Sequence, residues 1–102
     1  MSWRIEVKPT AEKQYFKLGK TARQRIQGAL LELKQAENPL LHHTVRHLTG
    51  KLRGDYRLRV GDWRVLFTPD RAEKVIYVYA ILPWGDTYWR FSDEMIFQGI
   101  AG

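Results

Sequence analysis

Three arginines lie close together in a stretch of strand-forming residues, and this is the strongest chemical signal in the sequence. Residues 56–67 read Tyr-Arg-Leu-Arg-Val, then Gly-Asp, then Trp-Arg-Val-Leu-Phe. A guanidinium presents a planar fork of N–H donors that matches the oxygens of a phosphate, so clustered arginines favour the binding of an anion. Whether Arg57, Arg59 and Arg64 form a cluster depends on how the chain folds around them.

The same stretch predicts a β-hairpin. Apolar and charged residues alternate on both sides of Gly61-Asp62, and glycine at the first position of a two-residue loop suits a type II′ turn. In such a hairpin Arg59 lies opposite Arg64, and Arg57, opposite Leu66, shares their face. The other face then carries an unbroken apolar set that can pack beneath helices.

Like charges placed opposite one another disfavour a sheet, because unit charges about 5 Å apart repel by roughly 0.8 kcal/mol in water and by several times more near a low-dielectric surface. Folding alone would not select this arrangement, whereas a surface that binds a polyanion would. Arg46, Lys51 and Arg53 are expected to enlarge the basic surface. Two alternatives stay open: the arginine stems cover apolar sheet while their heads reach water separately, or the guanidiniums pair with Asp55, Asp62 or the acidic C-terminal residues.

Periodicity indicates strands at both ends of the fold. Alternating apolar and charged residues over about residues 2–8 predict a first strand, which Pro9 ends. Residues 74–82 predict a last strand, because β-branched and aromatic types dominate there. Residues 40–53 are expected to be irregular.

Two helices are predicted after the first strand. Thr10 is expected to cap a short helix that Gly19 closes, and a Thr21–Gln24 capping box starts a second helix, which ends at Asn38-Pro39. Helices joined this closely form an antiparallel pair. The order β-α-α-β-β-β therefore predicts an α+β fold, with a helical hairpin packed on one face of a largely antiparallel four-stranded sheet.

Length and composition limit the chain to one small domain. A chain of 102 residues, 44% of them hydrophobic, can build a single core without staples, and the lack of cysteine excludes disulfides and Cys-ligated zinc. The longest apolar run, Val75 to Pro83, is far shorter than the roughly 20 residues of a membrane span, so we expect no membrane association and a place in the reducing cytoplasm. The net charge of +6 attracts polyanions such as nucleic acid, a ribosome or an acidic protein.

Other chemistries lack their parts. His42, His43 and His47 lie near one another, but neither cysteine nor a nearby acidic residue completes a ligand set, so no metal site and no cofactor are expected. The sequence has no Gly-rich phosphate loop and no nucleophile elbow. Trp3 and Trp63 are in phase with core positions and are expected to be buried.

The segment after the last strand could present further groups beside the arginines. Pro83 and Gly85 bend and stiffen it, and Trp84 could stack on a base. Asp86 and Tyr88 are the acid and the phenol that the sequence places near the arginine cluster. An ordinary exit turn, with Tyr88 packed on the core, is equally open.

Residues 51–67 resemble the hairpin pattern of the RelE/ParE superfamily, which comprises toxins of type II toxin–antitoxin modules. The early helix and the order of the elements fit the same superfamily, and the resemblance covers about residues 3–90. It implies a RelE-like, microbial ribonuclease-type fold, with one toxin domain at residues 1–90 and a short tail at residues 91–102. The pattern identifies the superfamily better than the activity.

The RelE branch, to which the pattern is closest, implies a ribosome-dependent, metal-independent endoribonuclease that inhibits translation by cutting mRNA. In that chemistry the ribose 2′-OH attacks its own 3′-phosphate, the 5′-oxygen leaves, and a 2′,3′-cyclic phosphate forms. The residues that the resemblance or their position assigns to catalysis are Arg57, Arg59, Arg64, Asp86 and Tyr88. Those assigned to RNA binding are Arg46, Lys51, Arg53 and Trp84. Related ribonucleases place Arg or His where this chain has Pro83 and Trp84, so the general acid stays open.

The resemblance also implies partners: a cognate antitoxin that inhibits the toxin, and the ribosome with its mRNA. The antitoxin is expected to cover the arginines or to displace the residues after Tyr88. The ParE branch shares the scaffold but poisons DNA gyrase, which needs a binding surface and no catalytic set. A non-catalytic RNA-binding module is the third alternative.

Overall fold

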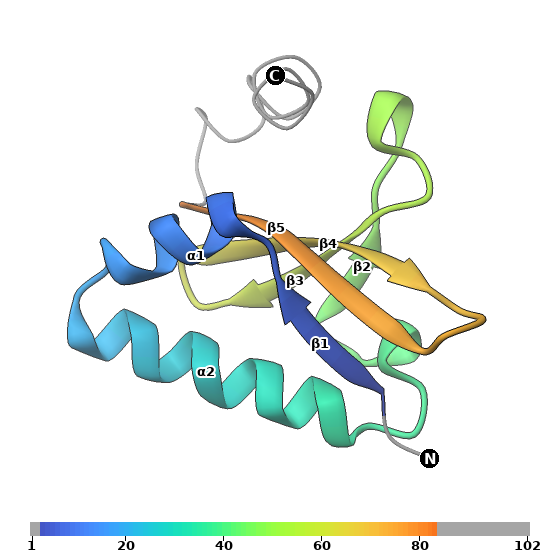
Figure 1. Cartoon of the computed structure of the whole chain (residues 1–102), viewed down its shortest axis with the longest axis horizontal. Coiled ribbons are helices and arrows are strands. Elements are labelled where there is room, and N and C mark those ends of the chain that lie inside the picture. Colours follow the sequence, from blue (N-terminus) through green and yellow to red (C-terminus); the bar gives the residue numbers. More distant parts are fainter. Residues whose placement is uncertain (1–2, 84–102) are drawn as a thin grey trace.

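Five strands form one sheet, and two helices cover one of its faces (Figure 1). The computed structural model describes residues 3–83. The elements are strand β1 (Arg4–Val7), helices α1 (Pro9–Phe16) and α2 (Lys20–Gln35), the 3₁₀ turn η1 (Pro39–Leu41), strand β2 (Val45–His47), the 3₁₀ turn η2 (Gly50–Leu52), and strands β3 (Tyr56–Val60), β4 (Trp63–Asp70) and β5 (Val75–Pro83).

The strands lie in the order β1-β5-β4-β3-β2. β1 runs parallel to β5, and the other neighbours are antiparallel. The α+β class and the helical hairpin are as predicted, but the prediction of four strands is wrong. The additional strand is β2, which lies within the stretch expected to be irregular. Its three residues are too few to show alternation, and pairing with β3 is what makes them a strand.

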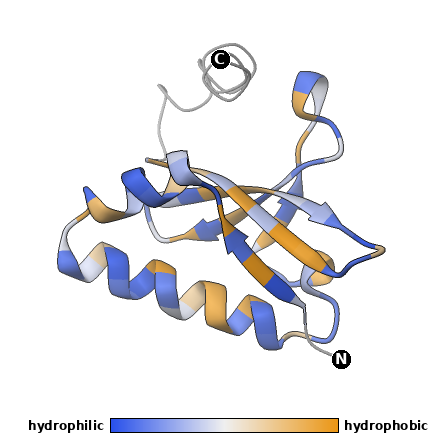
Figure 2. Ribbon diagram, in the orientation of Figure 1, coloured by the Kyte–Doolittle hydropathy of each residue, from blue (hydrophilic) through white to orange (hydrophobic). Residues whose placement is uncertain are grey.

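The core lies between the helices and the sheet. Ile26 and Leu33 of α2 are fully buried and meet Leu58, Val65 and Phe67 of the sheet in one apolar cluster. In Figure 2 the orange, apolar parts of α2 alternate with blue ones, as a helix with one apolar stripe requires. Burying each such side chain contributes about 1.5–3 kcal/mol. Among the helices of residues 3–83, none has the length and apolar character needed to cross a bilayer.

The predicted helix caps are wrong. α1 begins at Pro9 with Lys8 as its N-cap, and α2 begins at Lys20 with Gly19 as its N-cap; neither has a side-chain capping bond. Proline suits the first helical position, because its φ is already helical and the N–H that it lacks would have no helical acceptor there. α1 therefore starts one residue before Thr10.

The β3–β4 hairpin has the predicted two-residue loop. Val60 pairs with Trp63, and Gly61 has a φ of 56° while Asp62 is not in the positive region. A positive φ at the first loop residue alone is the signature of a type II′ turn. Trp3 is buried as predicted, whereas Trp63 is only partly buried.

Candidate nucleic-acid interface

The sheet face away from the helices gathers four arginines from three strands. Arg59 pairs with Arg64 across the hairpin, and Arg57 pairs with Arg46 of β2 on its other side. Residues directly opposite in an antiparallel pair point to the same side of the sheet. Arg57 and Arg59 are two residues apart on β3 and so also share a side, which places all four arginines on one surface. We call Arg46, Arg57, Arg59 and Arg64 the arginine face. The hairpin register that the sequence predicted is confirmed, and β2 brings Arg46 beside Arg57.

The four guanidiniums differ in how they are held. Arg46 and Arg59 are exposed and Arg57 is partly buried, but Arg64 is only 6% exposed. Arg64 Nη1 donates to the carbonyl oxygens of Gly61 and Trp63, each at 2.9 Å. The backbone of the hairpin turn thus anchors Arg64 while its neighbour Arg59 reaches water.

The carboxylates of residues 3–83 form no ion pair with the exposed arginines. The ion pairs found within residues 3–83 are Arg4–Glu6 and Glu32–His42, and neither involves Arg46, Arg57 or Arg59. Asp55, one of the predicted alternatives, instead accepts hydrogen bonds from the hydroxyls of Thr68 at 2.9 Å and Tyr79 at 2.8 Å. Within residues 3–83, Arg57 and Arg59 therefore have no carboxylate in an ion pair with them, and the acidic C-terminal residues of the other alternative lie outside the described residues.

Two of the predicted RNA-binding residues lie away from the arginine face. Lys51 and Arg53 are exposed on the β2–β3 connection, which forms the light-green excursion in Figure 1. This connection leaves the sheet beyond the His47–Tyr56 pair, whereas Arg59 lies next to the opposite end of β3. At about 3.4 Å per residue, roughly 10 Å of strand separates Tyr56 from Arg59. Trp84, Asp86 and Tyr88 lie outside the described residues, and their roles stay predictions.

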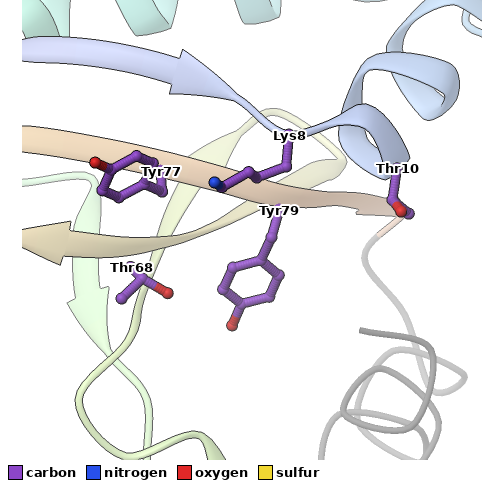
Figure 3. A pocket seen from close by; sticks show the side chains of 5 residues that line it. All are labelled: Lys8, Thr10, Thr68, Tyr77 and Tyr79. Carbon is purple, nitrogen blue, oxygen red and sulfur yellow. The ribbon is translucent and has the colours of Figure 1, made fainter. Parts of the chain in front are cut away.

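A pocket on the same side of the sheet escaped the sequence analysis. It has a volume of about 450 Å³ and is lined by Lys8, Thr10, Thr68, Tyr77 and Tyr79 (Figure 3). Tyr77 pairs with Thr68 across β4 and β5, and a register shift between Leu66 and Phe67 leaves Tyr79 as an extra residue of β5. The spacing of Tyr77 and Tyr79 in the sequence is a signal that both could face one side of the sheet. The position of Lys8, which directly follows β1, depends instead on the parallel pairing of β1 with β5.

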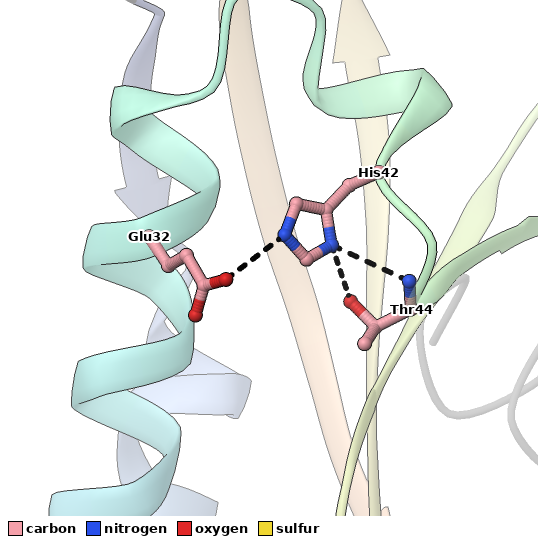
Figure 4. A network of polar contacts seen from close by, with 3 residues as sticks. All are labelled: Glu32, His42 and Thr44. Atoms are coloured by element: carbon pink, nitrogen blue, oxygen red, sulfur yellow. Dashed lines mark hydrogen bonds and ion pairs between the residues drawn. The ribbon is translucent and has the colours of Figure 1, made fainter.

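The histidines form a different arrangement from the one expected. His42 Nε2 lies 3.2 Å from Glu32 Oε1, and its Nδ1 lies 2.8 Å from Thr44 Oγ1 and accepts from the Thr44 backbone N–H (Figure 4). An acidic residue is therefore close to His42, and the His43 ring stacks on it. Across residues 3–83, no three His, Cys, Asp or Glu side chains are grouped to hold a metal ion. The network joins α2 to the segment before β2, which is a structural role.

Comparison with known proteins identifies the family. A family model described as the ParE toxin of the type II toxin–antitoxin system parDE matches residues 5–88. No curated protein matches the sequence. Among solved structures, a chain of the archaeal RelE–RelB complex from Pyrococcus horikoshii is 27% identical, with a TM-score of 0.67 over 84% of this chain and 99% of that chain.

Two further structures show the same fold at lower identity. A mutant of the E. coli toxin RelE in the free state has a TM-score of 0.67 and 21% identity, over 91% of this chain and 94% of that chain. The YoeB/ParE toxin from Agrobacterium tumefaciens has a TM-score of 0.66 and 11% identity, over 80% of this chain and 99% of that chain. Because the family model spans most of the sequence and the fold is that of RelE toxins, the chain belongs to the ParE toxin family of type II toxin–antitoxin systems, within the RelE/ParE superfamily.

Proposed function

We propose that this toxin is a ribosome-dependent endoribonuclease that cleaves mRNA without a metal ion. The observation that supports it best is the arginine face, where paired strands hold like charges together and no carboxylate of residues 3–83 pairs with Arg57 or Arg59. Guanidiniums brought together at a cost to the sheet suit a site for the phosphates of a nucleic acid.

In this proposal Arg57 and Arg59 hold the scissile phosphate. Arg64 stabilises the charge that gathers on the phosphate oxygens as the reaction proceeds. Its guanidinium is already oriented by the carbonyls of Gly61 and Trp63, and a donor that is fixed and shielded from water acts more strongly on developing charge.

The reaction is a transesterification within the RNA. The 2′-oxygen bonds to phosphorus, the bond from phosphorus to the 5′-oxygen breaks, and the leaving 5′-oxygen takes a proton from water, so the products are a 2′,3′-cyclic phosphate and a free 5′-hydroxyl. Asp86 is the proposed base for the 2′-OH proton, and Tyr88 is proposed to contact the nucleotide. The ribosome contributes by holding the message in a reactive geometry, which can replace several kcal/mol of acid–base catalysis. Arg46, Lys51, Arg53 and Trp84 are proposed to bind flanking RNA.

A cognate antitoxin is the proposed inhibitor. The related chains from Pyrococcus horikoshii and E. coli were solved in complexes of RelE with RelB. By analogy, an antitoxin segment is proposed to cover the arginine face of this toxin, where acidic side chains would neutralise Arg57 and Arg59. Action on ribosomes would place the toxin in the cytoplasm.

Inhibition of DNA gyrase is the second candidate, because the family model that matches the chain is that of ParE toxins. This function needs a binding surface and no reacting groups. The arginine face would then contact DNA phosphates or an acidic surface of gyrase.

One assay separates the two functions. Purified toxin is incubated with programmed ribosomes, with the same RNA alone, and with gyrase and supercoiled DNA. The ribonuclease proposal predicts RNA cut only on ribosomes, ends with a 2′,3′-cyclic phosphate, and suppression by the antitoxin. Intact RNA together with gyrase-linked DNA breaks would replace it with the second candidate.

A further inference from the structure

The pocket lined by Lys8, Thr10, Thr68, Tyr77 and Tyr79 has no part in the chemistry proposed for the arginine face. Its walls are the Lys8 side chain, with its ammonium, and four hydroxyl-bearing side chains, two of which are tyrosines with aromatic rings. The Lys8 ammonium can donate hydrogen bonds to phosphate oxygens, and tyrosine rings offer faces on which a base can stack.

Lys8 is placed at the pocket by its backbone. The residue before a proline is kept extended, and Lys8 has φ −70° and ψ 156°, with its N–H bonded to Val78 O at 2.7 Å. Its Nζ lies 4.6 Å from the centroid of the Tyr77 ring, toward which the side chain extends in Figure 3. Within residues 3–83 no carboxylate forms an ion pair with Lys8. The ring holds the charge without neutralising it, so the charge can attract a phosphate.

Asp55 holds the opposite wall of the pocket. Its Oδ1 accepts from the Thr68 hydroxyl and its Oδ2 from the Tyr79 hydroxyl. Tyr79 is only 8% exposed, whereas Tyr77, which pairs with Thr68, is partly exposed. The pocket therefore combines one wall that Asp55 holds in place with one accessible aromatic ring, that of Tyr77.

The pocket lies on the same surface as the arginine face. Arg57 pairs with Leu66, and Thr68 follows Leu66 by two residues on β4. Strand spacing then separates Arg57 from Thr68 and Tyr77 by roughly 8 to 12 Å. A single-stranded RNA held by Arg57 would span this distance with a few nucleotides.

We propose that this pocket is a second RNA subsite, which binds one unpaired nucleotide beside the scissile phosphate. The phosphate meets the Lys8 ammonium, and the base stacks on the Tyr77 ring. This inference rests on the proposed function, since it takes RNA as the ligand of the arginine face.

An NMR titration tests the subsite without cleavage. ¹⁵N-labelled toxin is titrated with a uridine tetranucleotide whose riboses carry 2′-O-methyl groups, so that no attack can occur. We expect saturable shifts of the Thr68 and Tyr77 amides. Lys8→Gln should weaken the affinity derived from them at least fivefold, and Tyr77→Leu similarly. Lys13→Gln removes the same charge from an exposed site on α1 and should leave the affinity within twofold.

The outcomes distinguish this inference from the proposed function. Shifts confined to the neighbours of Arg57 and Arg59 would overturn the subsite and leave the ribonuclease proposal to the ribosome assay. Equal affinity for inorganic phosphate and for the tetranucleotide would also overturn it, because the pocket would then be an anion site only. Lys8→Gln changes an exposed side chain, so the test stands even where Tyr77→Leu disturbs folding.

Discussion

Two arginines of the same face are expected to do different work because their surroundings differ. Arg64 is buried and bonded to the turn carbonyls, whereas Arg59 is exposed. An anchored donor is suited to charge that develops during the reaction. We expect Arg64→Ala to lower kcat on programmed ribosomes by about 10²- to 10³-fold, as removal of an oriented donor does elsewhere, with ribosome affinity changed less than threefold. Equal losses in kcat and affinity would make Arg64 a docking contact.

Arg57 and Arg59 are expected to act in ground-state binding as well. Replacing both by alanine removes two charge-assisted contacts to phosphate, each contributing roughly 1.5–3 kcal/mol. RNA affinity should fall by at least two orders of magnitude. Lys34→Ala is the control, because it removes a charge from an exposed site on α2, on the other side of the sheet. A similar loss in the control would reduce the arginine face to a contribution to net charge.

At the scale of the elements, the β3–β4 turn decides whether the arginines meet. Gly61 adopts a φ of 56°, which costs a residue with a side chain about 1–2 kcal/mol, and the nearest obstacle to a Cβ is the flexible end of Arg25. We expect Gly61→Ala to destabilise the toxin by about that amount in urea unfolding. Gly28→Ala is a control of opposite sign: the site lies inside α2 in open space, where alanine should stabilise by about 0.5–1 kcal/mol. A stabilising Gly61→Ala would contradict the turn geometry.

For the whole molecule, the net charge of +6 makes association with RNA dependent on salt. Each phosphate neutralised on a single strand contributes about −0.7 to the slope of log affinity against log salt concentration. Contacts from Arg46, Arg57 and Arg59 therefore predict a slope of roughly −2, and Arg59→Ala should reduce its magnitude by about 0.7. Binding titrations at several salt concentrations measure both values. A slope near zero would show that phosphates are not the ligand.

The sequence by itself determined the fold class, the helical hairpin and the pairing of Arg59 with Arg64. These follow from local physics: periodicity places apolar residues on one face, and a two-residue loop with Gly61 allows one register. The predicted helix starts are wrong, because α1 begins at Pro9 and α2 at Lys20, each one residue before the threonine predicted as its cap.

The tertiary structure alone decided what depends on contacts distant in sequence. β2 becomes a strand, and Arg46 joins the arginine face, because β3 offers a pairing edge to three residues with no periodicity of their own. Lys8 reaches Tyr77 because β1 pairs in parallel with β5, whose residues lie 71 positions later in the chain than their partners in β1. Pairing of Asp55 with the arginines was one of the open alternatives, but the register of β4 and β5 brings it the hydroxyls of Thr68 and Tyr79. Side-chain types show which contacts are favourable, but only strand order and register decide which of them form.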